Sequence, residues 1–385
     1  MKVAFPHMGN AYIPLRALVE HMGVEAVVPE RPNCATLELG ARHAPEFVCL
    51  PFKITLGDCI NALERGADTM AMVCGMWACR FGNYGHVQHL ILRDMGYEFE
   101  SLLIGREDPR RVWEKVKPAV GRRAFARLLG AAAVFRAKAA AVEEIERLAR
   151  FARPREEATG SADALMERYL ARVDEADTIR RVHELRHELR EEFAALPLRR
   201  ENGVLRVRIV GELYVLLEPS LNFDLVRRLG SNHGVEAQPI LSTYRWLLSP
   251  LWLDPFLHLS SARARRVSRA YLPYVLGGEE HMTITGTLDA PRQGFDGVIH
   301  AYPLTCMPEN ICRTILPHIS AARDVPVLGL CFDEHTSTVG TATRLEAFID
   351  MLRSRRRAYP ARSRTLTSTG RLSGPPGPGG GGGSR

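Results

Sequence analysis

The chain has 385 residues, 46% of them hydrophobic and 25% charged, an ordinary composition for a globular protein of two or more domains. Its net charge of +7 does not indicate nucleic-acid binding, because eight arginines and no acidic residue follow position 352, and the rest of the chain carries −1. The N-terminus lacks a signal-peptide pattern, and the most apolar helical run, 128–135, is too short to span a bilayer. We expect a cytoplasmic protein that binds neither nucleic acid nor membranes.

Residues 1–104 alternate short apolar strands with helical patterns. The expected strands are 2–5, 24–28, 69–73 and 97–104, and the expected helices are 13–22, 56–65 and 84–95. Gly66 and Gly96 mark helix ends, since glycine readily adopts the left-handed C-terminal cap. This alternation predicts a doubly wound parallel sheet.

Residues 105–203 have a different pattern. Long Arg, Glu and Ala stretches carry leucines at helical spacing, with few strand formers, and residues 154–161 should break this block in two. We predict a helical segment between two α/β domains.

Residues 204–352 return to alternating strands and helices. The expected strands are 205–209, 214–217, 295–300 and 325–332, and the expected helices are 224–229, 309–319 and 341–352. The pattern predicts a second parallel-sheet domain. Residues 353–385 are rich in Arg, Gly and Pro, a composition that buries no core, so we predict a disordered C-terminal tail.

Eight cysteines gather toward the two ends of the chain. They are Cys34, Cys49, Cys59, Cys74, Cys79, Cys306, Cys312 and Cys331. In a cytoplasmic protein this number favours metal or redox chemistry over disulfides. Cys59 and Cys331 lie inside apolar helix or strand patterns and suit simple packing. Cys49, Cys79 and Cys306 lie instead at turns, where thiolates can bind iron–sulfur clusters or zinc.

The expected topology suggests where these thiols meet. Cys74 and Cys79 follow the strand that ends at Val73, and Cys306 follows the strand 295–300. Open parallel sheets bind ligands beyond the carboxyl ends of their strands. Two such domains facing each other would bring Cys49, Cys79 and Cys306 to one interdomain cleft.

One motif matches a zinc-protease signature. His183-Glu184-Leu185-Arg186-His187 places two histidines four residues apart, on one helical face. The segment repeats His-Glu-Leu-Arg within a charged amphipathic helix, and no third ligand is recognisable after it. We favour a solvated helix face and keep the protease as the less favoured alternative.

Two further motifs leave alternatives open. Gly277-Gly278, before Glu279, could hold an anion at a helix N-terminus or form a plain turn. Asp333-Glu334-His335-Thr336 could serve acid–base chemistry or cap the following helix. The sequence has no G-x-x-x-x-G-K-[ST] loop, so we expect no ATP hydrolysis by this chain alone.

Several segments of the two α/β regions carry a resemblance to a known family. The N-terminal segments are Phe5-Pro6-His7-Met8-Gly9-Asn10, Leu37-Glu38-Leu39-Gly40, Pro45-Glu46-Phe47-Val48-Cys49-Leu50-Pro51 and Cys79-Arg80-Phe81-Gly82. The C-terminal segments are Glu218-Pro219, Asn222-Phe223-Asp224, Gly294-Phe295-Asp296-Gly297-Val298-Ile299, Thr305-Cys306-Met307-Pro308-Glu309 and Phe332-Asp333-Glu334-His335-Thr336. These segments resemble the CoA protein activases, a family related to the 2-hydroxyacyl-CoA dehydratases. The resemblance covers residues 1–104 and about 205–352.

The resemblance implies two flavodoxin-like domains with a [4Fe–4S] or double-cubane cluster between them. It implies Cys49, Cys79 and Cys306 as cluster ligands. The family pattern has another cysteine at the place of Met76, and Cys74 is the nearest substitute, so Cys74 is a fourth candidate. His7, Asn10, Arg80 and His335 are candidates to hydrogen-bond the cluster sulfurs.

The implied function is low-potential electron transfer, or reductive chemistry of a reductase or dehydratase (lyase) type. The implied partner is a separate activator ATPase of the actin-like fold, and a homodimer or a related dehydratase subunit also fits. The alternative is a non-catalytic, metal-binding scaffold for such an ATPase.

Overall fold

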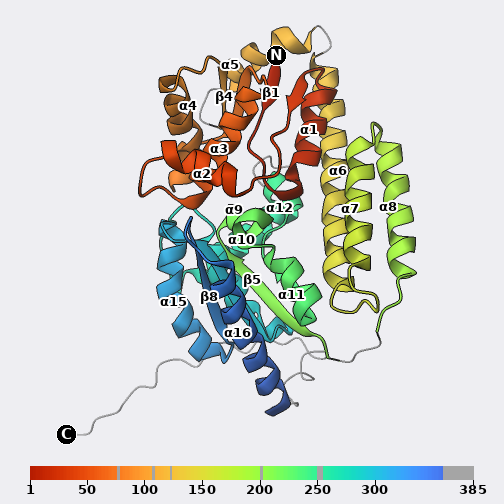
Figure 1. Ribbon diagram of the computed structural model, residues 1–385, viewed down its shortest axis with the longest axis vertical. Coiled ribbons are helices and arrows are strands. Elements are labelled where there is room, and N and C mark those ends of the chain that lie inside the picture. Colours follow the sequence, from red (N-terminus) through yellow and green to blue (C-terminus); the bar gives the residue numbers. More distant parts are fainter. Residues whose placement is uncertain (76–78, 106–108, 122–123, 200–202, 249–254, 359–385) are drawn as a thin grey trace, which may run out of the picture.

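The computed structural model describes residues 1–75, 79–105, 109–121, 124–199, 203–248 and 255–358. Within these ranges the chain forms two four-stranded parallel sheets, one above the other in Figure 1, with long helices beside them. The predicted α/β class with two parallel-sheet domains is confirmed. No helix in these ranges has both the length and the apolar character needed to cross a membrane.

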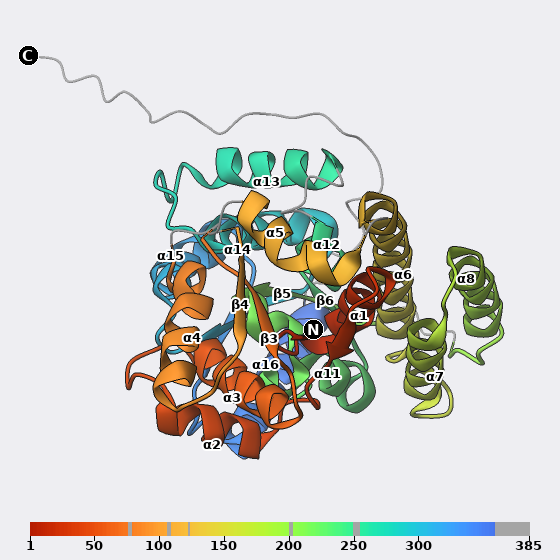
Figure 2. The same cartoon turned by 90° about the horizontal axis from the view of Figure 1, so that it is seen from above.

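The first sheet has the strand order β2-β1-β3-β4. Its strands are β1 (Lys2–Ala4), β2 (Glu25–Val27), β3 (Thr69–Val73) and β4 (Glu100–Ile104). Its helices are α1 (Tyr12–His21), α2 (Cys34–His43), α3 (Leu50–Glu64), α4 (Tyr84–Asp94) and α5 (Pro109–Val120), with short turns η1 (Gly9–Ala11) and η2 (Arg80–Asn83). Helices α1 and α5 lie on one side of this sheet and α3 and α4 on the other (Figure 2).

The second sheet has the equivalent order β6-β5-β7-β8. Its strands are β5 (Leu205–Gly211), β6 (Val235–Pro239), β7 (Gly297–Pro303) and β8 (Val327–Phe332). Helices α11 (Leu225–His233) and α16 (Thr338–Ala358) pack on one face, and α14 (Glu280–Asp289) and α15 (Met307–Arg323) pack on the other. The remaining elements are α9 (Leu213–Leu217), α10 (Pro219–Asn222), α12 (Thr243–Leu248), α13 (Pro255–Ser268) and η3 (Pro291–Gln293).

The strand order places a topological switch point in each sheet, between β1 and β3 and between β5 and β7. Gly211, the last residue of β5, has φ +139°, and a Cβ there would lie 1.8 Å from the carbonyl oxygen of Ala301 in β7. Only glycine accepts both the backbone angle and the contact. Gly211 thus lets β5 and β7 pack closely at the switch point. Ligands of such sheets bind there, beyond the carboxyl ends of the strands.

The helical segment connects the two domains physically. It contains α6 (Ala124–Ala152), α7 (Ser161–Glu175) and α8 (Ile179–Ala194). The break between α6 and α7 covers residues 153–160, one residue earlier than the predicted 154–161. Ile13 of α1 is buried in the core of these three helices. Phe135 and Ala139 of α6 are buried in the core of the second domain. Helix α6 therefore packs against both α/β domains (Figure 1).

The predicted strand 214–217 is wrong, because this segment is helix α9. Its residues Leu213, Tyr214, Val215 and Leu216 are all buried. A short run that is apolar on every side carries no periodicity, so strand and helix cannot be told apart by pattern. The helix is fixed locally by Glu212, whose side chain accepts a 2.9 Å hydrogen bond from the backbone N–H of Val215.

The predicted tail begins too early. Helix α16 continues to Ala358, and Arg353 donates a 2.7 Å hydrogen bond to the carbonyl of His233. Arg355 donates one of 2.8 Å to the carbonyl of Asp324. Arginine is a good helix former, and these contacts hold the last turns against the second domain. The rest of the predicted tail, 359–385, lies outside the described residues.

The sequence pattern also missed elements between 230 and 294. The structure has β6, α12, α13 and α14 there, although no element was expected. Helix α14 is buried along its whole length, so it lacks the polar face that marks an amphipathic helix.

Candidate functional site

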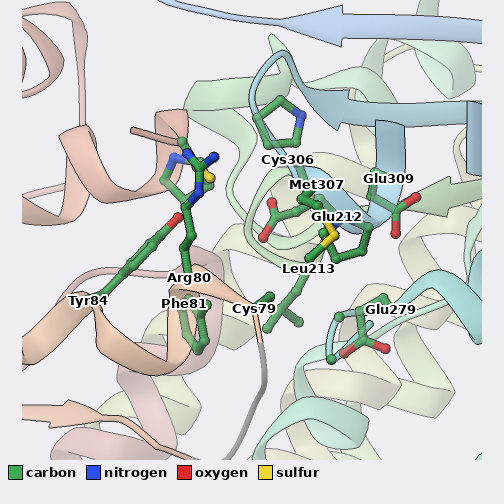
Figure 3. Close-up of a pocket in the computed structure, with 16 residues that line it drawn as sticks. Cys79, Arg80, Phe81, Tyr84, Glu212, Leu213, Glu279, Cys306, Met307 and Glu309 are labelled. Atoms are coloured by element: carbon green, nitrogen blue, oxygen red, sulfur yellow. The ribbon is translucent and has the colours of Figure 1, made fainter. Parts of the chain in front are cut away.

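A pocket lies between the two α/β domains, at the carboxyl ends of both sheets. It contains about 590 Å³ of non-protein space, including the part that opens to solvent. Its walls come from β3–α4 and the start of α3 in the first domain, and from β5–α9, the loop before α14 and β7–α15 in the second (Figure 3).

Three cysteines from both domains line this pocket: Cys49, Cys79 and Cys306. Cys49 is the N-cap residue of α3, Cys79 that of η2 and Cys306 that of α15. The thiol of Cys49 also donates a 3.5 Å hydrogen bond to the carbonyl of Thr305, next to Cys306. The helix dipole of α15 favours a thiolate at Cys306, but burial and the nearby Glu212 and Glu309 outweigh it and raise the pKa of this thiol.

The fourth candidate, Cys74, does not line the pocket. It is completely buried, and its backbone N–H donates a 2.8 Å hydrogen bond to the carbonyl of Ile104. Its sulfur packs against Gly85, where a Cβ would lie only 2.7 Å from it. Three other cysteines also lie outside the pocket lining: Cys59 in α3, Cys312 in α15 and Cys331 in β8. Such positions are typical of cysteines that pack within helices and strands.

Three glutamates from the second domain share the pocket with the thiols: Glu212, Glu279 and Glu309 (Figure 3). Burial, and secondly the nearby Glu309 carboxylate, raise the pKa of Glu279 to about 7. Burial likewise raises the pKa of Glu212 to about 7, against the lowering effect of backbone N–H donors. Glu309 accepts hydrogen bonds from Thr283 Oγ1 at 3.1 Å and pairs with His300 Nε2 at 2.8 Å.

Sequence reasoning did not assign a site role to these carboxylates. A signal existed for Glu212, which immediately follows β5 at the switch point of the second sheet. Glu309 lies in the same motif as Cys306, three residues further on. Glu279 enters the pocket because the chain before α14 packs against the start of α15, where a Cβ on Gly278 would lie 2.9 Å from Pro308. No local pattern indicates this contact.

The pocket is rich in acids and poor in cations. Burial raises the pKa of Cys306, and the nearby Glu212 and Glu309 raise it further; burial also raises the pKa of Cys79. Among the described residues that line the pocket, only Arg80 is basic, and it is exposed. A bound cation would stabilise the charged forms of these acids. The donor set therefore fits a metal centre and does not fit a phosphate or another anion.

Thiolate ligands are typical of iron–sulfur clusters and zinc. Within the described part of the chain, no three His, Cys, Asp or Glu side chains form a group that could hold one metal ion. The thiols of the pocket come from separate walls, and a multinuclear cluster spans its thiolates through its own metal and sulfide atoms. Sulfur donors are the ligand type that such clusters take, and three of them line one pocket.

Of the four expected hydrogen-bond donors to a cluster, only Arg80 lines the pocket. His7 instead pairs with Glu218 at 3.2 Å, and Asn10 donates to Glu146 at 2.8 Å. The backbone N–H of His335 donates to Asp333 at 2.9 Å, in the turn before α16. The structure therefore does not bring His7, Asn10 or His335 to the lining of the pocket.

The remaining motifs take structural roles. In α8, Glu184 pairs with Arg180 at 2.9 Å and with Arg181 at 3.2 Å, while His183 and His187 are exposed, as a solvated helix face requires. At the glycine pair, the backbone N–H of Gly278 donates to the Glu280 carboxylate at 2.9 Å, so a side chain already fills the expected anion site. The turn interpretation is the better one.

The segment 333–336 forms a turn before α16 and does not face the pocket. Asp333 Oδ1 accepts a hydrogen bond from Thr336 Oγ1 at 2.7 Å, and Glu334 pairs with Lys53 of α3 across the domain interface. Ser337 occupies the N-cap position, and its hydroxyl accepts a 3.4 Å bond from Gly340 N–H.

No protein-family model and no curated protein matches this chain. The class of protein is thus defined by fold and site alone: two parallel-sheet α/β domains with thiols and carboxylates around an interdomain pocket.

Proposed function

We propose that this chain is an iron–sulfur protein that holds a [4Fe–4S] or double-cubane cluster in the interdomain pocket, with Cys49, Cys79 and Cys306 as thiolate ligands. One observation carries the proposal: cysteines from three separate elements of two domains line the same acidic pocket. The absence of Cys74 from that lining leaves three protein thiolates. One metal position is then left for a substrate or a non-protein ligand.

The cluster supplies low-potential electrons, either for transfer or for reductive chemistry of a reductase or dehydratase (lyase) type. The chain's own residues exclude bulk water and set the surroundings of the cluster. Phe81, Leu213 and Met307 form apolar parts of the pocket wall. Burial and hydrogen bonding around the sulfurs determine the potential of such centres.

The electrons come from a separate activator ATPase of the actin-like fold, which docks transiently beside the pocket. Exposed apolar side chains next to the pocket support a docking surface: Phe47 is 76% exposed, Leu304 50% and Met307 42%. Arg80 donates a 2.8 Å hydrogen bond to the Phe47 carbonyl, which joins this surface to the pocket wall. Exposed apolar groups that gather from two domains are typical of interaction sites. A second copy of the chain or a related dehydratase subunit is a further partner, and the cytoplasm is the proposed location.

Metal analysis of protein purified without oxygen tests the proposal. We expect brown protein with broad visible absorption, iron and acid-labile sulfide. Colourless protein that contains no iron after anaerobic cluster reconstitution would contradict it. Equimolar zinc without visible absorption would favour the scaffold alternative.

Single substitutions identify the ligands. Cys49→Ser, Cys79→Ser and Cys306→Ser should each remove most of the bound iron. Cys312→Ser is the matched control for Cys306, because Cys312 lies in α15, the helix that Cys306 precedes, and outside the pocket lining. Cys74→Ser and Cys331→Ser should retain their iron. Loss of iron in Cys74→Ser with normal folding would add Cys74 to the ligand set.

A further inference from the structure

A second cavity lies in the first domain, under helix α5. It shares no lining residue with the cysteine pocket and contains about 980 Å³ of non-protein space, including its opening. Its floor is the first sheet, through Val3, Ala71 and Leu102, and its roof is α5, through Val112, Trp113 and Val116. No charged or polar side chain appears among the described residues that line it.

The core on this side of the sheet is incompletely packed. Val3, Val24 and Val120 are buried, but Trp113, Val116 and other neighbours are only partly buried. Protein interiors normally fill such space at crystal-like density. A large cavity with only apolar walls has no partners for ordered water and favours an apolar ligand.

Basic residues stand beside the lining residues. Lys117 follows the lining residue Val116 on α5, and it is exposed. Arg127 is also exposed, and its Nη1 would lie 2.7 Å from a Cβ on Gly23, between the lining residues Met22 and Val24. Lys117 and Arg127 therefore place positive charge at the edge of the cavity, which complements an anionic head group.

Exposed apolar side chains lie at the same edge. Ile104 belongs to the cavity lining, and Phe125 and Leu129 lie within one turn of the lining residue Leu128 on α6. An apolar chain that enters the cavity would meet an apolar entrance beside the basic groups. The apolar cavity and the basic residues at its edge are complementary to the alkyl chain and the anionic head of an amphiphile.

We infer that this cavity binds a single-chain anionic amphiphile, with the alkyl chain between α5 and the first sheet and a carboxylate or phosphate head beside Lys117 and Arg127. The inference does not depend on the proposed cluster, because the two sites use different residues. The ligand contributes binding energy through burial of its methylene groups, and the basic residues select the charge of its head.

Calorimetric titration of the full chain with dodecanoate, below its micelle concentration, tests the inference. We expect saturable one-to-one binding of dodecanoate and of dodecyl phosphate, weaker binding of dodecanol, and none of butyrate or inorganic phosphate. Quenching of Trp113 by a brominated fatty acid should report the same affinity and should disappear in Trp113→Phe. Equal binding of butyrate and dodecanoate would overturn the inference.

Filling the cavity should remove the binding. Ala71→Leu places three extra carbons on the cavity floor and should weaken dodecanoate binding roughly tenfold or more. Ala322→Leu, the same change on exposed α15, is the matched control and should bind normally. Val116→Phe fills the cavity from α5 and provides a second variant if Ala71→Leu does not fold. Normal dodecanoate affinity in a folded, filled variant would overturn the inference.

Charge variants test the head group. The double variant Lys117→Gln, Arg127→Gln should reduce the preference for dodecanoate over dodecanol. The double variant Arg265→Gln, Arg266→Gln, in the last turn of α13, should keep that preference. A separate arm uses phosphatidylserine vesicles. Vesicle binding that survives Ala71→Leu, without binding of monomeric dodecanoate, would assign the surface to a membrane and overturn the cavity inference.

Discussion

The carboxylate of Glu218 in the second domain accepts a 2.7 Å hydrogen bond from the backbone N–H of Gly9 in the first. The same oxygen lies 3.2 Å from His7 Nδ1, and the hydroxyl of Tyr214 donates to the His7 carbonyl. Gly9 has φ +49°, and a Cβ there would lie 2.2 Å from the carbonyl oxygen of Leu217. This contact sets the separation of the two domains and hence the width of the pocket between them.

Glu218→Gln should destabilise the chain. Glutamine offers one oxygen where Glu218 uses both, since Oε1 also accepts from the Ser220 N–H at 3.1 Å. A buried donor left without its acceptor costs about 1–3 kcal/mol of the free energy of unfolding. Urea titration measures this loss. Glu38→Gln, in an exposed pair with Arg42, is the control and should change stability by less than about 0.5 kcal/mol.

The effect of Glu218→Gln should depend on pH in a defined direction. Burial alone would raise the pKa of Glu218, but the bonds from His7, Gly9 and Ser220 hold it below its usual value of 4.5. A lowered carboxyl pKa stabilises the fold above the unfolded pKa, and this contribution is lost as the pH falls through the folded pKa. The difference from wild type should therefore shrink below pH 4.5. A difference that grew on acidification would contradict this assignment.

His89 should make the fold sensitive to mild acid. Its imidazole is buried, with Nδ1 2.5 Å from Ser101 Oγ, and burial, followed by the nearby Arg93, lowers its pKa from 6.5 to about 4. The unfolded chain takes up the proton near pH 6.5 and the folded chain only near pH 4, so stability falls as the pH decreases through this window. The full loss is on the order of 3 kcal/mol.

Two measurements check the His89 prediction. The NMR signal of the His89 ring should stay unshifted between pH 7 and 5, and His89→Gln should flatten the decline of unfolding free energy with falling pH. A ring signal that titrates near pH 6.5 would show it to be wrong.

Gly211→Ala should disrupt the switch point of the second sheet. A Cβ there meets both a φ of +139° and the Ala301 carbonyl at 1.8 Å, so the cost should exceed about 3 kcal/mol. Gly234→Ala separates the two causes, because Gly234 has φ +61° with nothing within 4 Å of a Cβ. That control should cost only about 1–2 kcal/mol. Equal losses in the two variants, measured by thermal unfolding, would rule out the close contact as the main cause.

Phe47→Ala should separate partner docking from cluster binding. Phe47 is exposed beside the pocket wall and does not line the pocket, so its removal should leave the iron content unchanged. Reduction of the protein by the activator ATPase with ATP should slow about tenfold or more, as expected when an exposed aromatic anchor is lost. Phe151→Ala, on the helical segment, is the control. Unchanged reduction rates in Phe47→Ala would remove this residue from the docking surface.

Much of the fold could be predicted because its signals are local. Strands such as Thr69–Val73 are short apolar runs between turn residues, and helices such as Tyr84–Asp94 end at a glycine. Predictions were wrong where burial removed the signal, as in α9, or where a helix was stabilised by remote acceptors, as at the end of α16. The local sequence pattern contains no information about complete burial in the tertiary structure or about hydrogen-bond acceptors far away in the chain.

The sequence by itself determined the alternation that makes two parallel sheets, and it distinguished Cys49, Cys79 and Cys306 from the cysteines that pack inside helices and strands. The expected topology also predicted that these three meet in one cleft. Tertiary structure alone decided that Cys74 packs against Gly85 outside the pocket lining, and that Glu212, Glu279 and Glu309 stand beside the thiols. The physical reason is that a residue's environment depends on which strand ends meet across a domain interface. That meeting is set by contacts between distant residues such as Gly9 and Glu218.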